Sequence, residues 1–216
     1  MGQVKVAAII PAYNESLRIS AVLAALLQAQ SVDDIFVVDD GSSDGTAEAA
    51  QDHGRVNVIH LDANVGKGGA MWAGAQDARA DVILFLDGDL IGLTASHVDA
   101  LVTPVRAGDT DMAVGVFRGG RGITDLSQLL LPYISGQRAI RRSLFLSVPR
   151  VATARFAVET KLTKFAKVHR LRVSYVPLCG VTHVMKEEKL GLVRGVVSRA
   201  CMYRDIALTL LRDGRA

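Results

Sequence analysis

The sequence of 216 residues is poor in three features that mark common protein classes. It has two cysteines, Cys179 and Cys201, which are too few for a disulfide scaffold and form no Cys-x-x-Cys pair. Aromatic residues make up 5% of the chain and few alternate with basic ones, which argues against nucleic acid as a partner. No apolar run approaches the length of a membrane span. These absences favour a reducing, cytoplasmic setting in which any membrane contact is peripheral.

The first residues are expected to form a strand. The apolar stretch from Met1 to Glu15 is interrupted by Lys5 and Pro11, so it predicts a first strand and not a signal peptide. Half of the residues are hydrophobic and 22% are charged, which is typical of a globular protein with a full core. We therefore expect one domain over residues 1–216.

Charge is divided unevenly along the chain, although the net charge is only +3. Residues 1–117 hold 6 Lys and Arg against 16 Asp and Glu, whereas residues 118–216 hold 19 against 6. An acidic half suits cation binding, and a basic half suits an anionic partner such as a phosphate, a carboxylate or an acidic membrane face. The sequence thus indicates a functional division near residue 117.

The first half alternates between apolar strand-like runs and amphipathic helical runs. This alternation predicts an α/β fold with a mainly parallel central sheet flanked by helices. The expected strands are Val4–Ile10, Ile35–Val38, Val56–Leu61, Val82–Leu86 and Met112–Phe117, and the expected helices are Ser16–Gln30, Thr46–His53, Gly68–Ala78 and Ser96–Arg106.

The second half is less regular. Helical patterns surround Leu126–Leu131 and Phe156–Val168, and a short strand fits Val173–Val176. A last helix from Leu190 to Leu211 mixes leucines and valines with arginines. Such a helix could lie on an anionic membrane. It could also be a core helix or a homodimer helix, which is the interpretation we favour.

Four polar clusters follow the first four predicted strands. In open α/β sheets, ligands bind beyond the carboxyl ends of the strands, so these clusters are expected to converge on one edge of the sheet. One cluster alone could be a turn with a helix cap, but four in series indicate a binding site. The clusters are Pro11–Glu15, Asp39–Thr46, Asn64–Gly68 and Asp87–Asp89.

Asp87-Gly88-Asp89 is the sharpest of the four. Two carboxylates emerge directly after a buried strand, and close carboxylates repel each other unless a cation lies between them. Oxygen ligands favour hard cations such as Mg²⁺ or Mn²⁺. Such an ion could bridge a diphosphate and neutralise its charge as it leaves. The motif therefore predicts a divalent metal site.

Lys67 lies in a glycine-rich loop that opens a helix, where backbone amides and an ammonium could hold a phosphate or an aspartate. The loop is not a Walker motif, because Leu61 stands where the first glycine should be and Gly68 follows the lysine. It is not a dinucleotide fingerprint either, because Met71 occupies the position of the third glycine. The two commonest nucleotide-binding loops are thereby excluded.

Taken together, Pro-Ala-Tyr-Asn-Glu, Val-Asp-Asp-Gly-Ser-Ser-Asp-Gly-Thr, Asn-x-Gly-Lys-Gly and Leu-Asp-Gly-Asp resemble the GT-A fold glycosyltransferases of family 2 over residues 4–118. The later chain is more loosely similar to the glucosyl-3-phosphoglycerate synthases of family 81. That similarity rests on Asp-Gly-Asp-Leu-Ile, on Gly-Gly-Arg-Gly-Ile-Thr-Asp-Leu, on Val158-Glu159 and on His183.

The resemblance implies a GT-A domain with a nucleotide-sugar half, 1–117, and an acceptor half, 118–216. Asp89 would ligate the metal, Asp87 would contact metal or ribose, and His183 would be a late metal or diphosphate ligand. A neutral imidazole is a sensible third ligand beside two carboxylates. The other donor contacts that the resemblance implies are Pro11, Tyr13, Glu15, Asp39, Asp40 and Lys67.

Glu159 is the only acid between Asp125 and Glu187. It could be a salt-bridged surface residue, or a base or hydrogen-bonding acid at the acceptor hydroxyl. The resemblance makes Gly119–Asp125 the acceptor loop, with Arg121 and Thr124 holding a phosphate or carboxylate. The segment Ser135–Arg138 is a further acceptor candidate, or else a turn before a basic helix. The family 81 loop has its arginine one position later than Arg121. Val181 stands where family 81 has an arginine two residues before the histidine.

The expected activity is metal-dependent transfer of a sugar from a nucleotide-sugar donor, with UDP-glucose the expected donor, to a small anionic or lipid-linked acceptor. A polyprenyl-phosphate glycosyltransferase at the inner face of the membrane is the alternative within this class. A nucleotidylyltransferase usually carries a basic glycine-rich loop after its first strand, and Tyr13-Asn14-Glu15 stand there instead. A non-catalytic nucleotide-sugar binder would not need both Asp87 and Asp89.

Overall fold

The computed structural model describes residues 3–118, 135–154 and 157–183. The predicted acceptor residues Arg121 and Thr124, the helical pattern at 126–131 and the expected last helix at 190–211 lie outside these residues. They stay predictions.

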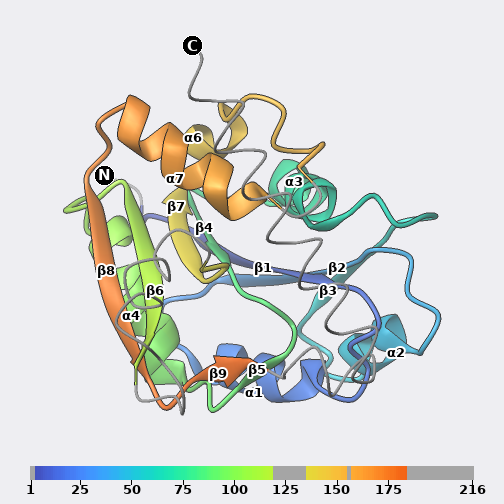
Figure 1. Ribbon diagram of the computed structural model, residues 1–216. Helices are drawn as coiled ribbons and strands as arrows, with labels where there is room; N and C mark the ends of the chain where they lie inside the picture. Colours follow the sequence, from blue (N-terminus) through green and yellow to red (C-terminus); the bar gives the residue numbers. More distant parts are fainter. Residues whose placement is uncertain (1–2, 119–134, 155–156, 184–216) are drawn as a thin grey trace.

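The core of the molecule is a seven-stranded sheet in the order β3-β2-β1-β4-β7-β6-β8 (Figure 1). Neighbouring strands are parallel except for β7, which pairs antiparallel with β4 on one side and with β6 on the other. The predicted mainly parallel sheet is confirmed. The strands are β1 (Val6–Ala12), β2 (Asp34–Asp39), β3 (Asn57–His60), β4 (Val82–Phe85), β6 (Met112–Arg118), β7 (Arg138–Arg141) and β8 (Val173–Cys179).

Helices cover both faces of this sheet, as Figure 1 shows. One face carries α1 (Ile19–Gln28), α2 (Thr46–Gln51) and α4 (Ala95–Arg106), and the other carries α3 (Lys67–Asp77), α6 (Arg142–Leu146) and α7 (Val158–Val168). The continuous apolar run of β1 follows from this arrangement. Ala8 and Ile10 pack on the face covered by α1, α2 and α4, whereas Ala7 and Ile9 pack on the face covered by α3, α6 and α7. In the described parts of the chain, no helix has the length and apolarity to cross a membrane.

The segment after residue 135 differs from the sequence prediction. Arg138–Arg141 forms strand β7 between β4 and β6, and the helix that was considered from Ser135–Arg138 onward begins only at Arg142. The basic residues of this segment favour no strand, but Ala139 and Ile140 are buried between two neighbouring strands. Tertiary burial has therefore overridden the local pattern.

A second, two-stranded sheet joins distant parts of the chain. β5 (Leu90–Ile91) pairs antiparallel with β9 (Thr182–His183), so that Leu90 lies opposite His183. The turn after β5 needs glycine, because Gly92 has a φ of +76° and a Cβ there would collide with the carbonyl oxygen of Gly180. This pairing brings residue 183 to the carboxylates that follow β4.

Candidate active site

Asp87 and Asp89 leave the carboxyl end of β4 and meet His183 at the edge of the sheet. His183 Nδ1 lies 3.3 Å from Asp89 Oδ1 and 4.0 Å from Asp87 Oδ2. One ligand atom from each of the three residues lies within 4.8 Å of the other two. All three side chains are partly open to solvent. Two carboxylates and an imidazole at this spacing could hold a divalent cation such as Mn²⁺ or Mg²⁺.

The charge around His183 supports this interpretation. Burial lowers the pKa of the imidazole, but the hydrogen bond to Asp89 and the negative charge of Asp87 outweigh burial and raise it above its usual value. The ring also stands edge-on to Phe117, with centroids 4.8 Å apart, which fixes its orientation. The site thus attracts a positive charge at this position, which is either a proton or a metal ion.

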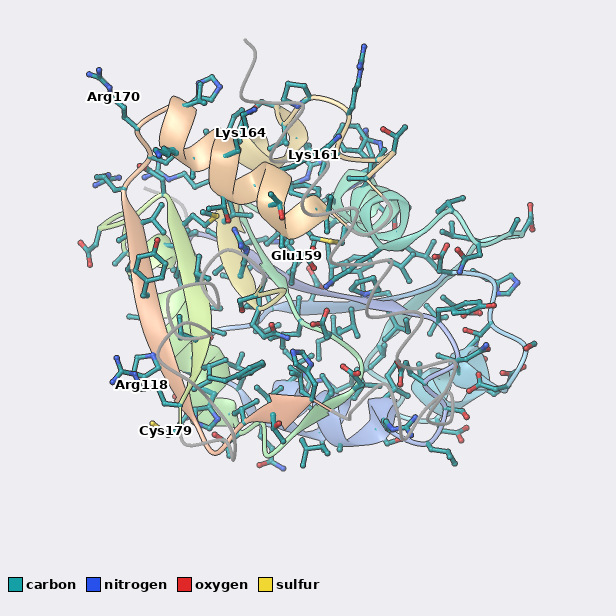
Figure 2. The ribbon with its side chains drawn as sticks, in the orientation of Figure 1. Arg118, Glu159, Lys161, Lys164, Arg170 and Cys179 are labelled. Carbon is teal, nitrogen blue, oxygen red and sulfur yellow. The ribbon has the colours of Figure 1, made fainter. Side chains whose placement is uncertain are left out.

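Lys67, the first residue of α3, bridges two carboxylates from different parts of the chain. Its Nζ lies 2.6 Å from Asp87 Oδ1 and 2.5 Å from Glu159 Oε1. Burial lowers the pKa of the ammonium, yet the charges of Asp87 and Glu159 reverse this effect and raise the pKa above its usual range. Lys67 is therefore a fixed cation beside the carboxylate cluster. Figure 2 shows Glu159 at the start of α7, with Arg170 beyond the other end of the helix.

Two residues next to this cluster, Gly136 and Gln137, were predicted only as part of a candidate acceptor segment, and no contact with the carboxylates was expected of them. Gly136 lies so close that a Cβ there would come within 2.6 Å of Lys67 Nζ and 2.7 Å of Asp87 Oδ2. Gln137 is fully buried and donates its Nε2–H to Asp87 Oδ2 over 2.9 Å. Sequence patterns carry no signal for this contact, because it depends on β7 lying beside β4.

Arg138 was predicted to contact the acceptor, which stays a prediction, and the structure shows an additional role for it. Its side chain is 1% exposed, with Nε donating to the carbonyl of Ser135 and Nη2 donating to Thr163 Oγ1. Burial lowers the pKa of the guanidinium to about 10, against the charge of Glu159, so it stays protonated at neutral pH. Arg138 thus ties β7 to the helix that carries Glu159, and little of its surface is left for direct contact with an acceptor.

Asp39 and Asp40, at the end of β2, hold neighbouring loops. Asp40 accepts hydrogen bonds from the backbone amides of Val65 and Gly66, at 2.7 and 2.9 Å, and so fixes the loop that leads to Lys67. Asp39 accepts one from the amide of Ser42 and lies 2.8 Å from His60 Nδ1. Both carboxylates are buried. Their predicted contact with base or ribose stays a prediction, and their loop-holding role is an additional finding.

The first polar cluster lies beside the second one. Asn14, whose φ is +56°, and Ser43 are joined by a hydrogen bond from the Ser43 amide to Asn14 Oδ1. Pro11 is half-buried and Tyr13 is 50% exposed, so both offer surface to a ligand at this edge. The side chain of Glu15 lies next to Gly88. The four predicted strand-end clusters therefore do converge on one edge.

With this geometry in place, comparison with known proteins decides the family. A family model described as "Glycosyl transferase family 2" matches residues 7–164. The chain belongs to glycosyl transferase family 2. Its predicted GT-A fold is confirmed by solved structures that superpose over nearly the whole chain.

Two curated relatives show how the family similarity is distributed. Glycosyltransferase AglD of Haloferax volcanii is 34% identical over 124 residues, which are 52% of this chain and 19% of the relative. A dolichyl-phosphate beta-glucosyltransferase of Trichomonas vaginalis is 36% identical over 94 residues, which are 38% of this chain and 28% of the relative. The matched stretches thus span less than a third of these relatives' lengths.

Similar solved structures include a glucosyl-3-phosphoglycerate synthase of Mycobacterium tuberculosis, in complex with Mn²⁺, UDP and glucosyl-3-phosphoglycerate. It is 26% identical, has a TM-score of 0.79, and covers 97% of this chain and 79% of its own. A further complex of that enzyme contains Mn²⁺, UDP-glucose and phosphoglyceric acid, with a TM-score of 0.71 over 84% of this chain and 72% of the other. The looser resemblance to this enzyme group is thereby confirmed at the level of structure.

Proposed function

We propose that the protein is a metal-dependent glycosyltransferase that moves a sugar from a nucleotide-sugar donor to a small anionic or lipid-linked acceptor. The observation that carries this proposal is the cluster of Asp87, Asp89 and His183 beside the fixed ammonium of Lys67. Such a cluster could hold a divalent cation and a diphosphate together.

In this proposal, Asp87, Asp89 and His183 would hold the cation, and Lys67 is paired with Asp87. A cation held there would supply positive charge against the negative charge that develops on the departing diphosphate. Lys67 adds a second positive charge at the same edge. Pro11, Tyr13, Glu15 and the residues around Asp39 would hold the rest of the nucleotide. UDP-glucose is the proposed donor, since it occurs in the similar solved structures.

Glu159 is proposed to orient groups at the acceptor side of the site. Its carboxylate is paired with Lys67 at 2.5 Å and its side chain is 12% exposed. The ammonium of Lys67 already donates a hydrogen bond to Glu159 Oε1, so this oxygen is occupied. We therefore favour a positioning or hydrogen-bonding role for Glu159 over the role of a free general base. This leaves both inverting and retaining outcomes open.

The acceptor is proposed to be anionic because the second half of the chain is basic, with 19 Lys and Arg against 6 Asp and Glu. Phosphoglyceric acid is bound in similar solved structures, which supports a small phosphorylated acceptor. Similarity to a dolichyl-phosphate glucosyltransferase supports the second candidate, a polyprenyl phosphate at a membrane surface. Arg121 and Thr124 are the proposed acceptor-binding residues.

Thermal-shift measurements with UDP-, GDP- and dTDP-sugars, each with and without Mn²⁺, test the donor half of the proposal. A nucleotide sugar at about 100 times its Kd stabilises a protein by about 2.7 kcal/mol, which gives a clear rise in Tm. We expect a UDP-sugar to raise Tm only with Mn²⁺. We expect His183→Ala to lose this effect, whereas His53→Ala, a substitution outside the cluster, keeps it. If no nucleotide sugar shifts Tm in either condition, the proposal is wrong.

Product formation separates the two acceptor candidates. The protein is incubated with Mn²⁺, radiolabelled UDP-glucose and either 3-phosphoglycerate or a polyprenyl phosphate in anionic vesicles. Label in the water-soluble phosphorylated product supports the first acceptor. Label in the organic phase, lost at high salt, supports the second. Donor binding without label in either product would contradict both acceptor proposals.

A further inference from the structure

The two carboxylates of the cluster are held in different ways. Asp89 meets His183, which belongs to the cluster itself. Asp87 is bound by two groups outside the cluster. Lys67 forms an ion pair with its Oδ1, and Gln137 donates a hydrogen bond to its Oδ2. Lys67 already has a proposed role at the diphosphate. Gln137 has none, although it is fully buried and its amide is aimed at the carboxylate.

The orientation of the Gln137 amide is decided by chemistry. An ionised carboxylate can only accept hydrogen bonds, so the NH₂ group of Gln137 must face Asp87. The amide oxygen then faces the hydroxyl of Ser135, whose Oγ lies 3.3 Å away. The single hydroxyl proton of Ser135 goes to the nearer acceptor, the carbonyl oxygen of Gly115 at 2.6 Å, while Ser135 Oγ accepts from the backbone amide of Gln137 at 3.4 Å. Ser135 thus ties the backbone of Gln137 to that of β6.

The backbone around Gln137 is fixed as firmly as its side chain. The amide of Gly115 donates to the carbonyl of Gln137 over 2.8 Å, and β7 begins at the next residue between β4 and β6. Gly136 lets this segment approach Asp87 closely, since any side chain there would collide with Lys67 and Asp87. Ser135, Gly136 and Gln137 therefore form a rigid support on one side of Asp87.

From this geometry we propose that Gln137, supported by Ser135, is a positioning residue that fixes the Asp87 carboxylate for divalent cation binding. The inference rests on the proposed function, because it assumes the cation site of Asp87, Asp89 and His183. Hydrogen-bond partners behind metal ligands orient those ligands, and losing one typically lowers metal affinity by about 10- to 100-fold. A neutral amide donor suits this position because it adds no charge to the carboxylate pair.

The test is the affinity of the full chain for Mn²⁺ alone, measured from the electron paramagnetic resonance signal of free Mn²⁺. Gln137→Met keeps the length of the side chain but removes the amide. We expect its Kd for Mn²⁺ to rise about 10-fold or more. Ser135→Ala should raise the Kd in the same direction by less. Gln76→Met, an exposed position on α3, should leave it unchanged.

Kinetics distinguish positioning from a general structural role. Gln137→Met should raise the concentration of Mn²⁺ that gives half-maximal transfer and keep most of kcat at saturating Mn²⁺. A residue that only supports the core would lower Tm without changing Mn²⁺ affinity. A folded Gln137→Met with a Kd within about twofold of wild type overturns the inference. If that variant does not fold, an unchanged Kd in Ser135→Ala overturns it.

The outcomes also separate this inference from the proposed function. Wild-type protein that binds no Mn²⁺ overturns both. Wild-type protein that binds Mn²⁺ with the expected dependence on Gln137, but transfers no sugar to any acceptor, supports the inference and contradicts the proposed activity. Binding and transfer that are both insensitive to Gln137→Met leave the proposed function standing and overturn only the role of Gln137.

Discussion

The first and second halves of the described chain contribute to the candidate site in different ways. Residues 3–118 supply the groups at the strand ends, namely the two carboxylates of Asp87 and Asp89 and the ammonium of Lys67. Residues 135–183 supply the partners that hold these groups, namely Gln137, Glu159 and His183. Neither half contains the complete cluster.

This division falls at the abrupt change of charge near residue 117. The acidic half concentrates negative charge at one sheet edge, and the later half returns to that edge through β7, α7 and β9. Each carboxylate of the cluster is paired across the division, Asp87 with Gln137 and Asp89 with His183. The two halves are therefore linked at the site, and three of the four substitutions below test contacts between them.

Asp89→Ala should have the largest effect. It removes a carboxylate from the proposed cation site, and Lewis-acid stabilisation of a leaving group is worth several kcal/mol, so we expect transfer to fall by about 1,000-fold or more. Steady-state kinetics with UDP-glucose and Mn²⁺ measure this, with Asp52→Ala as an exposed control. Circular dichroism should show an unchanged fold. Wild-type activity in Asp89→Ala would refute the mechanism.

Lys67→Met tests the bridge between the halves. It leaves Asp87 and Glu159 facing each other without a cation, and breaking such a pair costs about 3 kcal/mol of folding free energy. Urea unfolding measures the loss, with Lys5→Met as an exposed control. In a double-mutant cycle with Glu159→Gln, the second substitution should recover part of the loss. Strictly additive effects would show that Lys67 and Glu159 are not coupled.

Asp40→Ala probes a loop within the first half. It leaves the amides of Val65 and Gly66 without the carboxylate that accepts their hydrogen bonds. We expect this to lower the free energy of unfolding by about 2 kcal/mol, because the lost acceptor is buried and charged. Because the loop leads to Lys67, we also expect a higher KM for the donor. Asp62→Ala, an exposed residue in the same loop, is the matched control. Equal stability of the two variants would contradict the loop-holding role.

Asp111→Asn should have the smallest effect, since it removes a surface pairing between the halves. Its hydrogen bonds and ion pair with Arg172, together with Arg141, lower the pKa of Asp111 to about 2. Because the pKa of Asp111 is lower in the folded than in the unfolded protein, its ionised carboxylate stabilises the fold at pH values above the unfolded pKa. This stabilisation is lost as the pH falls from about 4 to 2. We expect a loss of about 1 kcal/mol at pH 7 and none near pH 2.

Urea unfolding at both pH values measures this, and Asp109→Asn serves as the neighbouring exposed control. A loss in Asp111→Asn that persists unchanged at pH 2 would mean that its charge is not the cause. A loss in Asp109→Asn as large as that in Asp111→Asn would assign the effect to general surface charge.

The sequence by itself determined the alternation of strands and helices, the mainly parallel sheet and the polar strand ends. These features follow from local periodicity and from the rule that ligands bind at the carboxyl edge of such a sheet. The carboxylates of Asp87 and Asp89 could be recognised because they directly follow a buried strand. Family resemblance, and not periodicity, directed attention to Glu159 and His183.

Only the tertiary structure decided which distant groups meet. The bond between Gln137 and Asp87 joins positions 50 residues apart, and the contact between His183 and Asp89 joins positions 94 apart. Both depend on strand pairing, β7 beside β4 and β9 beside β5. The burial of Arg138 could not be predicted for the same reason, because a local pattern shows an arginine's charge but not the acceptors that allow its burial.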